Sequence, residues 1–526
     1  MSPFLFALFA ITIGGPTSHQ LSSTISVLQL WPPAAAQSGA SSPDSPNPPS
    51  KLPGCDPLKP VRPLASLNRS QPSVIVRSVD AEGSPFSAVS VTVEVASTRS
   101  DTQKGRSGRP LESGAYDLHL FRDGQVVRLW PNVLDNKYDE EEAADPSAGV
   151  LTWRKRHVIE LVSGRCVITF RHVLLPRRTD AKSVTFTAYA FNSDRVKSVT
   201  SPPYEYKLQS QKPSSFPTRR AYVIVMGVNA NESHLNLEIS VSSAERARML
   251  VRANVEKTYP DVVQVSLYSD LAPDSTRIVT KNARKIHLKT VLDLLAGRSV
   301  DPGLRDAVDP KHQIRPAAPD DAVILYVASH GYVDPQGNFY LIPYDTGYAW
   351  GLSEDVLARC KVDRSQSATC VQARLFLQRS ISSGDLANWW SGVDAGEVDM
   401  ILDSCHSGAA PGKEFRPAPL GDPGLGQLSY DKAMRILVAS QPAQTERGEW
   451  VEGGEGRTLL VEALEIAGRS NPQSSMSEWF RRTVRLLPSN IRKRYPVMRE
   501  EDVQAPELLD FSQPRNSADS PTGGTF

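Results

Sequence analysis

Apolar and polar residues alternate along much of the chain between residues 72 and 208. The run Val89–Val95 (VSVTVEV) has valine at every second position, which is typical of a half-buried β-strand. Two pairs of similar runs flank turn sequences and predict hairpins: Tyr116–Phe121 with Val126–Trp130, and Val158–Val162 with Cys166–Phe170. Because such strands follow one another without a long helical pattern, we expect an all-β, immunoglobulin-like sandwich over residues 72–208.

Beyond residue 218 the pattern changes to apolar runs separated by helical segments. The runs predict buried strands at Ala221–Val228, Val262–Tyr268, Ala322–Ala328, Val398–Leu402, Met434–Ala439 and Leu508–Phe511, with a short strand pair around Phe339–Ile342. Helical spacing predicts helices at Ser243–Tyr259, capped by Ser242 or Ser243, at Ala283–Leu295, from Ser382 or Ser383 through Trp390, at Thr458–Ala467 and at Met476–Leu487. This alternation favours an α/β domain over residues 218–512, with a mainly parallel sheet and helices on both faces.

The two ends of the chain are predicted to lie outside both domains. Pro3–Ile13 is an apolar run too short to span a bilayer, and Ala34–Ala36 fits a cleavage site, although no Lys or Arg precedes the run. We therefore expect residues 1–36 to be a signal peptide and the protein to be exported; the alternative is a disordered leader on a cytoplasmic chain. Residues 37–71, rich in Ser and Pro, are predicted to be a disordered linker, and residues 513–526 a disordered tail.

Composition narrows the classes of function. The 526 residues include 59 basic and 58 acidic side chains, so the net charge of +1 does not favour nucleic acid or an anionic membrane as a partner. Five cysteines are too few for a disulfide scaffold, although Cys360 and Cys370 can pair if the protein is exported. No phosphate-binding or dinucleotide-binding glycine motif is present, and no Cys/His pair has metal-ligand spacing. We expect no cofactor and no stable membrane span, and leave calcium activation open.

Two of the predicted buried strands end in reactive side chains. Ala322–Ala328 is followed by Ser329, His330 and Gly331, and the later strand is followed by Asp403, Ser404 and Cys405 in a run that ends in glycine. Parallel strands place their carboxyl ends at one edge of a sheet, so these two ends can meet. A thiol is mostly protonated at neutral pH, and an imidazole can take its proton.

This arrangement predicts Cys405 as a nucleophile and His330 as its base. The backbone N–H groups of Gly331 and Cys405 could form an oxyanion hole, because glycine lets the backbone approach a substrate closely. The structural alternative is a buried cysteine and a histidine in a turn.

The same residues carry a family resemblance. Tyr326–Asp345 (YVASHGYVDPQGNFYLIPYD) and Asp403–Gly408 (DSCHSG) resemble the His and Cys motifs of caspase-like peptidases, in the metacaspase and bacterial caspase-homologue branch. Arg220–Leu237, Ser380–Trp390 and Arg435–Glu446 resemble further segments of that domain. The resemblance implies a caspase-like fold over residues 218–512 and peptide-bond hydrolysis through a thioester.

The resemblance also implies a substrate preference. In metacaspases the acid two residues before the cysteine helps to bind Arg or Lys before the scissile bond, and Asp403 matches it; Glu446 could supply a second acid. The alternative is that Asp403 caps the turn after its strand. Ser243 stands where the family has a further pocket acid, and Ser329 stands where it has glycine, which bears on how the histidine loop sits.

We therefore expect an exported cysteine endopeptidase that acts on proteins or peptides, after Arg or Lys. A rival from another class is a catalytically silent caspase-like scaffold whose sandwich binds a protein partner. A third option is a hydrolase of another amide that uses the same two residues. The sandwich itself is expected to bind or position a protein partner, or to act only as a spacer.

Overall fold

The computed structural model describes most of the chain beyond residue 66. The described residues are 67–83, 88–133, 146–177, 182–208, 218–232, 236–272, 278–333, 338–347, 356, 360, 367–404, 425–440, 448–450, 456–499 and 503–512. The predicted signal peptide, most of the predicted linker and the predicted tail lie outside them. Among the described residues, no helix combines the length and the apolar character needed to cross a membrane.

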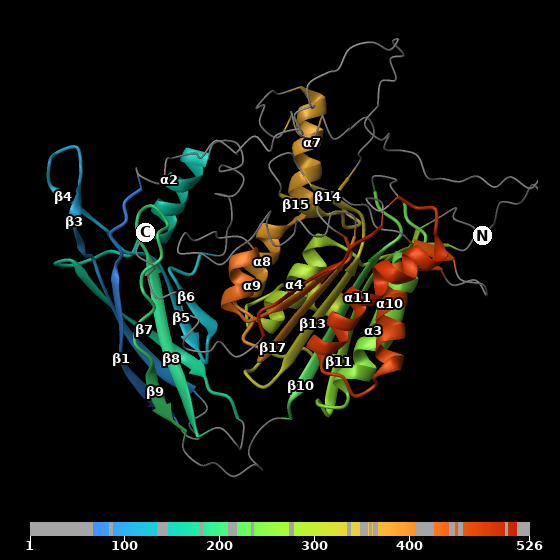
Figure 1. The fold of residues 1–526 in the computed structure, drawn as a ribbon, viewed down its shortest axis with the longest axis horizontal. Coiled ribbons are helices and arrows are strands. Elements are labelled where there is room, and N and C mark those ends of the chain that lie inside the picture. The colour runs from blue at the N-terminus through green and yellow to red at the C-terminus, as the bar shows by residue number, and fades with distance from the viewer. Residues whose placement is uncertain are drawn as a thin grey trace, which may run out of the picture. The chain divides into compact units, whose positions relative to one another are not determined.

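The residues before 208 form antiparallel sheets, as the alternating pattern predicts. One sheet contains β1 (Ser73–Glu82), β2 (Ala88–Ala96) and β7 (Arg165–Leu174). A second sheet contains β6 (Gln125–Trp130), β5 (Tyr116–Arg122), β8 (Ser183–Phe191) and β9 (Tyr204–Lys207), and β3 (Arg99–Lys104) pairs with β4 (Pro110–Glu112). Side chains from both larger sheets share one apolar core, and these sheets lie close together in Figure 1. The immunoglobulin-like assignment stays a prediction.

Two predictions in this region are wrong. An α-helix, α2 (Pro146–His157), stands where the pattern shows no helix, because its described part has a single fully buried apolar side chain, Trp153, and exposes Leu151. The predicted strand Val158–Val162 forms only isolated bridges, one at each end. The turn after it is tight: Ser163 and Gly164 both have positive φ, and Val162 pairs directly with Arg165.

The α/β region contains a seven-stranded sheet. The spatial order is β12 (Ile278–Lys281), β11 (Asp261–Leu271), β10 (Arg220–Val228), β13 (Ala322–Ala328), β17 (Glu397–Asp403), β18 (Arg435–Val438) and β21 (Glu507–Asp510). The strands from β11 to β18 are parallel and the two edge strands are antiparallel, which confirms the predicted mainly parallel sheet. Among the parallel strands the order is second, first, third, fourth, fifth, so the chain changes direction of winding between β10 and β13, where open α/β sheets bind ligands.

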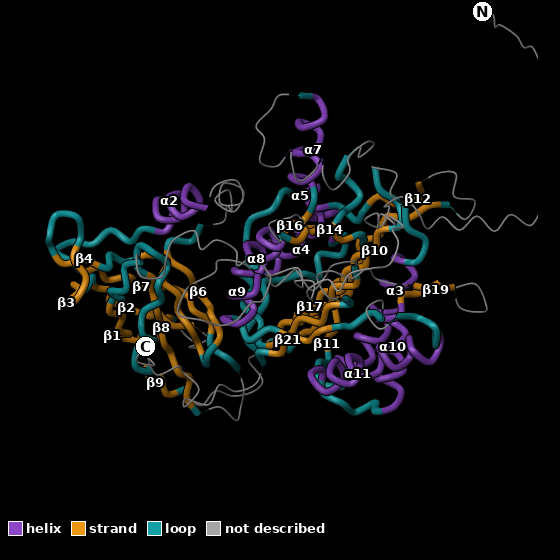
Figure 2. The backbone as a smooth tube through the Cα atoms, turned by 45° about the horizontal axis from the view of Figure 1, so that its top comes forward, coloured by secondary structure: helices purple, strands orange, loops and turns teal. Residues whose placement is uncertain are grey.

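Helices cover both faces of this sheet, as predicted (Figures 1 and 2). One face packs against α3 (Ser240–Val255), α10 (Leu459–Ser470) and α11 (Met476–Arg494). The other packs against α4 (Lys285–Leu295), α5 (Pro302–Val308), α8 (Ser383–Ser391) and α9 (Leu425–Asp431). Helix α11 continues past its predicted end at Leu487 in spite of Pro488, because its next turn buries Ile491 in the core.

Smaller elements lie beyond the carboxyl end of β13. A short sheet contains β14 (Gly331–Val333), β15 (Phe339–Leu341) and β16 (Ile381–Ser382), and α7 (Ala368–Arg379) packs beside it. A hairpin of β19 (Gly448–Trp450) and β20 (Gly456–Thr458) leads into α10. The helix α8 is capped by Ser382, one of the two predicted caps, through a reciprocal capping box with Asp385.

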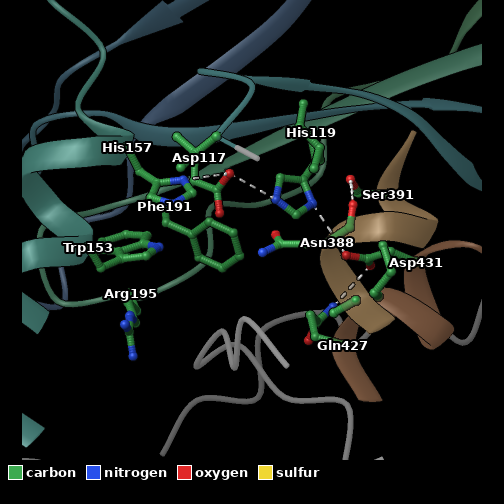
Figure 3. Close-up of a pocket in the computed structure, with 14 residues that line it drawn as sticks. Asp117, His119, Trp153, His157, Phe191, Arg195, Asn388, Ser391, Gln427 and Asp431 are labelled. Carbon is green, nitrogen blue, oxygen red and sulfur yellow. Dashed lines mark hydrogen bonds and ion pairs between the residues drawn. The ribbon is translucent and has the colours of Figure 1, made fainter. Parts of the chain in front are cut away.

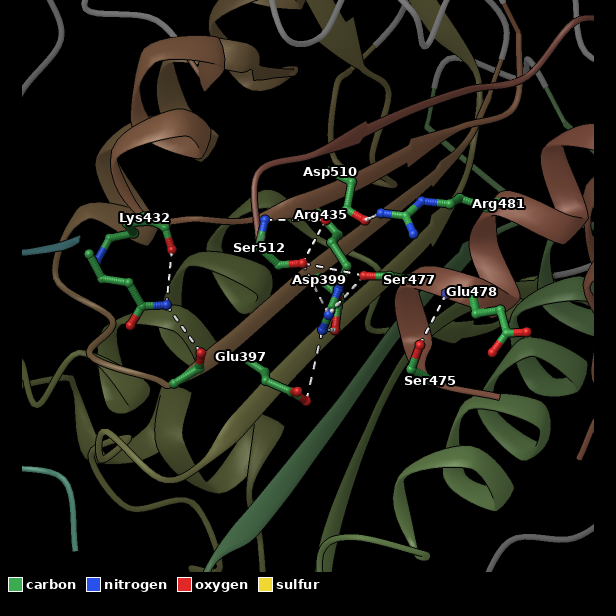
Figure 4. Close-up of polar contacts among 12 residues, drawn as sticks. Glu397, Asp399, Lys432, Arg435, Ser475, Ser477, Glu478, Arg481, Asp510 and Ser512 are labelled. Atoms are coloured by element: carbon green, nitrogen blue, oxygen red, sulfur yellow. Dashed lines mark hydrogen bonds and ion pairs between the residues drawn. The ribbon is translucent and has the colours of Figure 1, made fainter. Parts of the chain in front are cut away.

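A buried ion pair joins β17 to β18 below the strand ends (Figure 4). Arg435 contacts Asp399 through two guanidinium nitrogens, and both side chains are almost fully buried. Burial raises the pKa of Asp399 in spite of the Arg435 charge, while Asp399 raises the pKa of Arg435 against the effect of its own burial. The pair lies several residues before the end of β17, so we assign it a structural role.

Candidate active site

The strands that precede the two predicted catalytic residues are neighbours. β13 and β17 pair in parallel, and their last paired residues are Ala328 and Asp403. His330, which is half-buried, follows two residues after Ala328. Cys405 lies outside the described residues, as does Glu446, so the structure describes the base of the predicted pair and the strand that leads to the nucleophile.

The loop that carries His330 is fixed by its backbone. The carbonyl of His330 accepts a hydrogen bond of 3.0 Å from the N–H of Ile342. The next residue, Gly331, opens β14 and pairs with Leu341. The hydroxyl of Ser329 lies 2.6 Å from the carbonyl oxygen of Ile342, to which it donates. Ser329 therefore ties the loop that carries His330 to Ile342, the residue that follows β15.

Residues that follow β18 form hydrogen bonds with the backbone at the end of β17. Ser404 is completely buried, and its carbonyl accepts a hydrogen bond of 3.1 Å from the hydroxyl of Ser440. The N–H of Ala439 donates to the carbonyl of Leu402 at 2.9 Å. The backbone just before Cys405 is thus fixed on one side by β13 and on the other by residues that follow β18.

Asp403 is a buried carboxylate with two hydroxyl donors on one oxygen. Tyr326 of β13 and Thr458, the last residue of β20, both donate to its Oδ2, the latter at 2.6 Å. Thr458 is also the N-cap of α10, where its hydroxyl accepts the N–H of Val461. All three side chains of this group are at most 4% exposed.

Ser243 belongs to the same buried cluster. Its hydroxyl accepts a hydrogen bond of 2.9 Å from the backbone N–H of Thr458. The prediction that Ser242 or Ser243 caps the helix is wrong: α3 begins at Ser240, and its N-cap residue, Ile239, has no side-chain bond. Ser243 lies within the helix, and its hydroxyl binds the backbone of Thr458 instead of capping the helix.

Sequence reasoning did not find Tyr326 or Thr458 as parts of the site. The pattern predicts Tyr326 as part of a buried strand and of the segment that resembles a His motif, and it predicts Thr458 as the start of a helix. The strand period of two is one usable signal for Tyr326. It puts the side chains of Tyr326 and Ala328 on one face of β13, and Ala328 is the residue that pairs with Asp403. The contact with Asp403 depends on β-sheet register and on a residue more than fifty positions later in the chain, which the pattern does not contain.

Cys360 and Cys370 form a disulfide bond, with their Cα atoms 4.7 Å apart. Both are buried in a small apolar cluster with Tyr332 and Tyr340 of β14 and β15 and with Phe376 of α7. The disulfide therefore ties the start of α7 to Cys360 within the apolar cluster that packs on the short sheet. Cys166, in β7, is a free and half-buried thiol.

A pocket lies elsewhere, between the sandwich and the helices α8 and α9 (Figure 3). The Nε2 atom of His119 in β5 lies 3.3 Å from Oδ1 of Asp117, and its Nδ1 atom lies 3.3 Å from Oδ2 of Asp431 in α9. Trp153 and Phe191 form an aromatic wall of the same pocket. Among the residues that the structure describes, no group of three or more His, Cys, Asp or Glu side chains is arranged to hold a metal ion.

Comparison with known proteins finds similarity among solved structures alone. No family model matches the chain, and no curated protein matches it. Among solved structures, caspase-1 from Spodoptera frugiperda is similar over 57% of this chain and 91% of that chain, with 9% sequence identity and a TM-score of 0.28. A TM-score of this size is too low for the likeness to support a conclusion about fold or chemistry.

Proposed function

We propose that the chain is a cysteine endopeptidase that hydrolyses peptide bonds through Cys405 and His330. The observation that carries the proposal is the register of the two central strands. Ala328 pairs with Asp403, and each of them precedes one of the two proposed catalytic residues by two positions. Paired strands lie about 4.8 Å apart, and Cys405 is covalently bonded to Ser404, the buried residue that follows β17. A contact between the imidazole and the thiol therefore requires only a short reach.

The proposed reaction has two steps. The thiolate of Cys405 attacks the carbonyl carbon of the scissile bond, and the protonated His330 gives its proton to the leaving amine as the C–N bond breaks. Water then attacks the thioester after losing a proton to His330, and the C–S bond breaks to release the carboxylic acid. The backbone N–H groups of Gly331 and Cys405 are proposed to hold the negative charge on the carbonyl oxygen in both steps.

Specificity for Arg or Lys before the scissile bond is proposed to depend on Asp403. This residue is the last of β17 and lies two positions before the nucleophile. A buried carboxylate favours a guanidinium or ammonium partner, because the interaction is strong where water is excluded. Ser243 provides no second acid, and its hydroxyl is engaged by Thr458, so the proposed pocket has one described acid near the strand end.

We also infer that the protein is exported. The Cys360–Cys370 disulfide supports this, because disulfides persist in oxidising compartments and are rare in the cytosol. The apolar segment Pro3–Ile13 and the small residues Ala34–Ala36 support it independently. N-terminal sequencing of the protein from culture medium or an extracytoplasmic fraction tests it, and a mature chain that keeps Met1 contradicts it.

The decisive test of function compares full-length protein with its Cys405→Ala variant on fluorogenic peptides ending in Arg, Lys or Asp. We expect cleavage after Arg and Lys, and a loss of at least about a thousandfold in kcat/KM for Cys405→Ala, because a nucleophile has no substitute in the mechanism. His330→Ala should lose a similar factor. Cys166→Ala is the matched control, since this free thiol lies in β7 of the sandwich, and it should retain full activity.

Each alternative has its own outcome in this test. Turnover that does not depend on Cys405 refutes the mechanism. A folded protein that cleaves none of these peptides favours the silent scaffold. Cleavage after Asp alone refutes the assignment of Asp403 to substrate binding while leaving the Cys405 and His330 pair intact.

A further inference from the structure

We propose that Tyr326 and Thr458 are positioning residues that orient the Asp403 carboxylate toward the basic side chain of the substrate. The inference rests on the proposed function, in which Asp403 reads the residue before the scissile bond. Its basis is the geometry of the buried cluster, where both hydroxyls donate to the same carboxylate oxygen, Oδ2.

Two donors on one oxygen restrict the carboxylate in a way that one donor does not. The Asp403 side chain can rotate about its Cα–Cβ and Cβ–Cγ bonds, and a single hydrogen bond leaves part of that freedom. Tyr326 approaches from the neighbouring strand β13, and Thr458 approaches from the start of α10. Donors from two different elements fix the carboxylate plane before a substrate binds, and such preorganisation strengthens recognition of a planar guanidinium.

The Thr458 hydroxyl makes a second hydrogen bond, which fixes the direction in which its proton points. It accepts the N–H of Val461 as the N-cap of α10, so its proton is free to point to Asp403. The main chain of Thr458 is in turn held by Ser243 of α3. The serine that replaces the family's second acid thus holds a donor in place. The carboxylate also lies near the N-terminus of α10, where the helix dipole favours a negative charge.

A purely structural role makes a different prediction from a positioning role. If Thr458 only caps α10, loss of its hydroxyl should lower the free energy of unfolding and change the affinity for all substrates by the same factor. If it orients Asp403, its loss should weaken the recognition of a positive charge in particular. Arginine and citrulline separate these cases, because citrulline has nearly the same shape as arginine and no charge.

The experiment measures binding of two peptides that differ only in arginine or citrulline before the scissile bond. Calorimetry gives both Kd values for full-length protein carrying Cys405→Ala, alone and with Thr458→Val, Thr458→Ser or Tyr326→Phe. We expect Thr458→Val and Tyr326→Phe each to reduce the preference for arginine about tenfold, the effect of losing one hydrogen bond to a charged group. Thr458→Ser, which keeps the hydroxyl, should restore the preference to within about twofold.

Ser475→Ala is the matched control for a lost helix cap. Ser475 caps α11 through Glu478, at the exposed start of that helix, so its loss should leave the arginine preference unchanged. An unchanged preference in Thr458→Val and Tyr326→Phe overturns the inference, as does a parent protein that binds both peptides equally. If Thr458→Val does not fold, Tyr326→Phe, which keeps the buried ring, decides the question.

Failure of the inference and failure of the proposed function remain distinct. The same peptides are tested for cleavage with Cys405 present. Cleavage that depends on Cys405, together with an unchanged arginine preference in the two variants, leaves the peptidase assignment intact and removes the positioning role. Loss of the arginine preference in a protein that never cleaves the peptides supports the orienting cluster and removes the catalytic function.

Discussion

His119 lies between two carboxylates from different parts of the chain. Asp117 belongs to the same strand, and Asp431 ends α9. Burial alone would lower the pKa of His119, but the negative charges and hydrogen bonds of Asp117 and Asp431 outweigh it and raise the pKa to about 9. Burial has the opposite effect on a carboxyl group and would raise the pKa of Asp117. The charges of His119 and His157 outweigh burial and hold the pKa of Asp117 far below its usual range. His119 is therefore a cation at neutral pH.

The raised pKa predicts a specific dependence of stability on pH. An unfolded histidine has a pKa near 6.5, so the contribution of His119 should be fully present below that pH and should be lost as the pH rises through about 9. The difference in free energy of unfolding between the parent protein and His119→Gln should fall by about 3 kcal/mol over this range. Chemical denaturation at a series of pH values measures it.

An independent measurement checks the same prediction. An NMR titration of the His119 imidazole should have its midpoint near pH 9. Parallel stability profiles for the two proteins between pH 6.5 and 9.5 would contradict the assignment of a buried cation to this position.

At the scale of elements, the first residues of α3 are capped by Asn229, which lies eleven positions before the start of the helix. The side-chain oxygen of Asn229, just after β10, accepts the N–H groups of Ser240 and Val241 at 2.8 and 3.2 Å. The amide nitrogen of Asn229 donates to Asp270 at 2.8 Å. Gly227 allows this close approach, because a Cβ there would lie 2.9 Å from the carbonyl oxygen of Ser240. Asn229 thus performs the capping that no local side chain provides.

We expect Asn229→Ala to destabilise the protein by about 2 kcal/mol, at the upper end for a lost cap, because the side chain is buried and makes several bonds. The start of α3 also carries Ser243 toward the Asp403 cluster, so the preference for arginine over citrulline should fall as well. Thermal or denaturant unfolding measures the first effect. Ser475→Ala, which removes an exposed cap, should cost no more than about 1 kcal/mol, and an equal loss in both variants would contradict the special role of Asn229.

At the scale of the whole described structure, the sandwich and the α/β region share buried contacts. The apolar core on the α4 and α8 face of the sheet includes Phe121, Tyr189 and Phe191 of the sandwich strands. Arg122 forms a bidentate ion pair with Asp394, and both side chains are less than 10% exposed. Arg122 and Gln125 thus contact residues that precede β17 and β18, Asp394 and Lys432.

Breaking the buried pair should be costly. Arg122→Met leaves the Asp394 carboxylate buried without its main partner, so we expect a loss of about 3 to 5 kcal/mol in the free energy of unfolding. Arg77→Met removes the exposed pair between Arg77 and Glu94 within the sandwich and should cost less than about 1 kcal/mol. Equal costs for the two substitutions in denaturant unfolding would show that the Arg122 contact does not couple the two regions.

The sequence by itself determined the parallel strands of the central sheet and the position of the candidate chemistry along the chain, but it did not predict the antiparallel edge strand β12. Apolar runs such as Ala322–Ala328 and Val398–Leu402 are local signals, because a strand buried on both faces must be apolar along most of its length. His330 and Cys405 lie just beyond the ends of those runs, so a rule about strand ends was enough to select them. Periodicity does not contain the order of the parallel strands, which depends on how the strands pair in the folded sheet.

Only the tertiary structure decided how side chains far apart in sequence are used. Asp403 meets Tyr326 and Thr458, Asn229 caps α3, and His119 meets Asp431 because register and helix packing bring them together. The helix α2 was missed for a related reason, since a helix without an apolar stripe leaves no periodic signal. Periodicity reports which face of an element is buried, whereas the partner of a buried polar group depends on the arrangement of the whole chain.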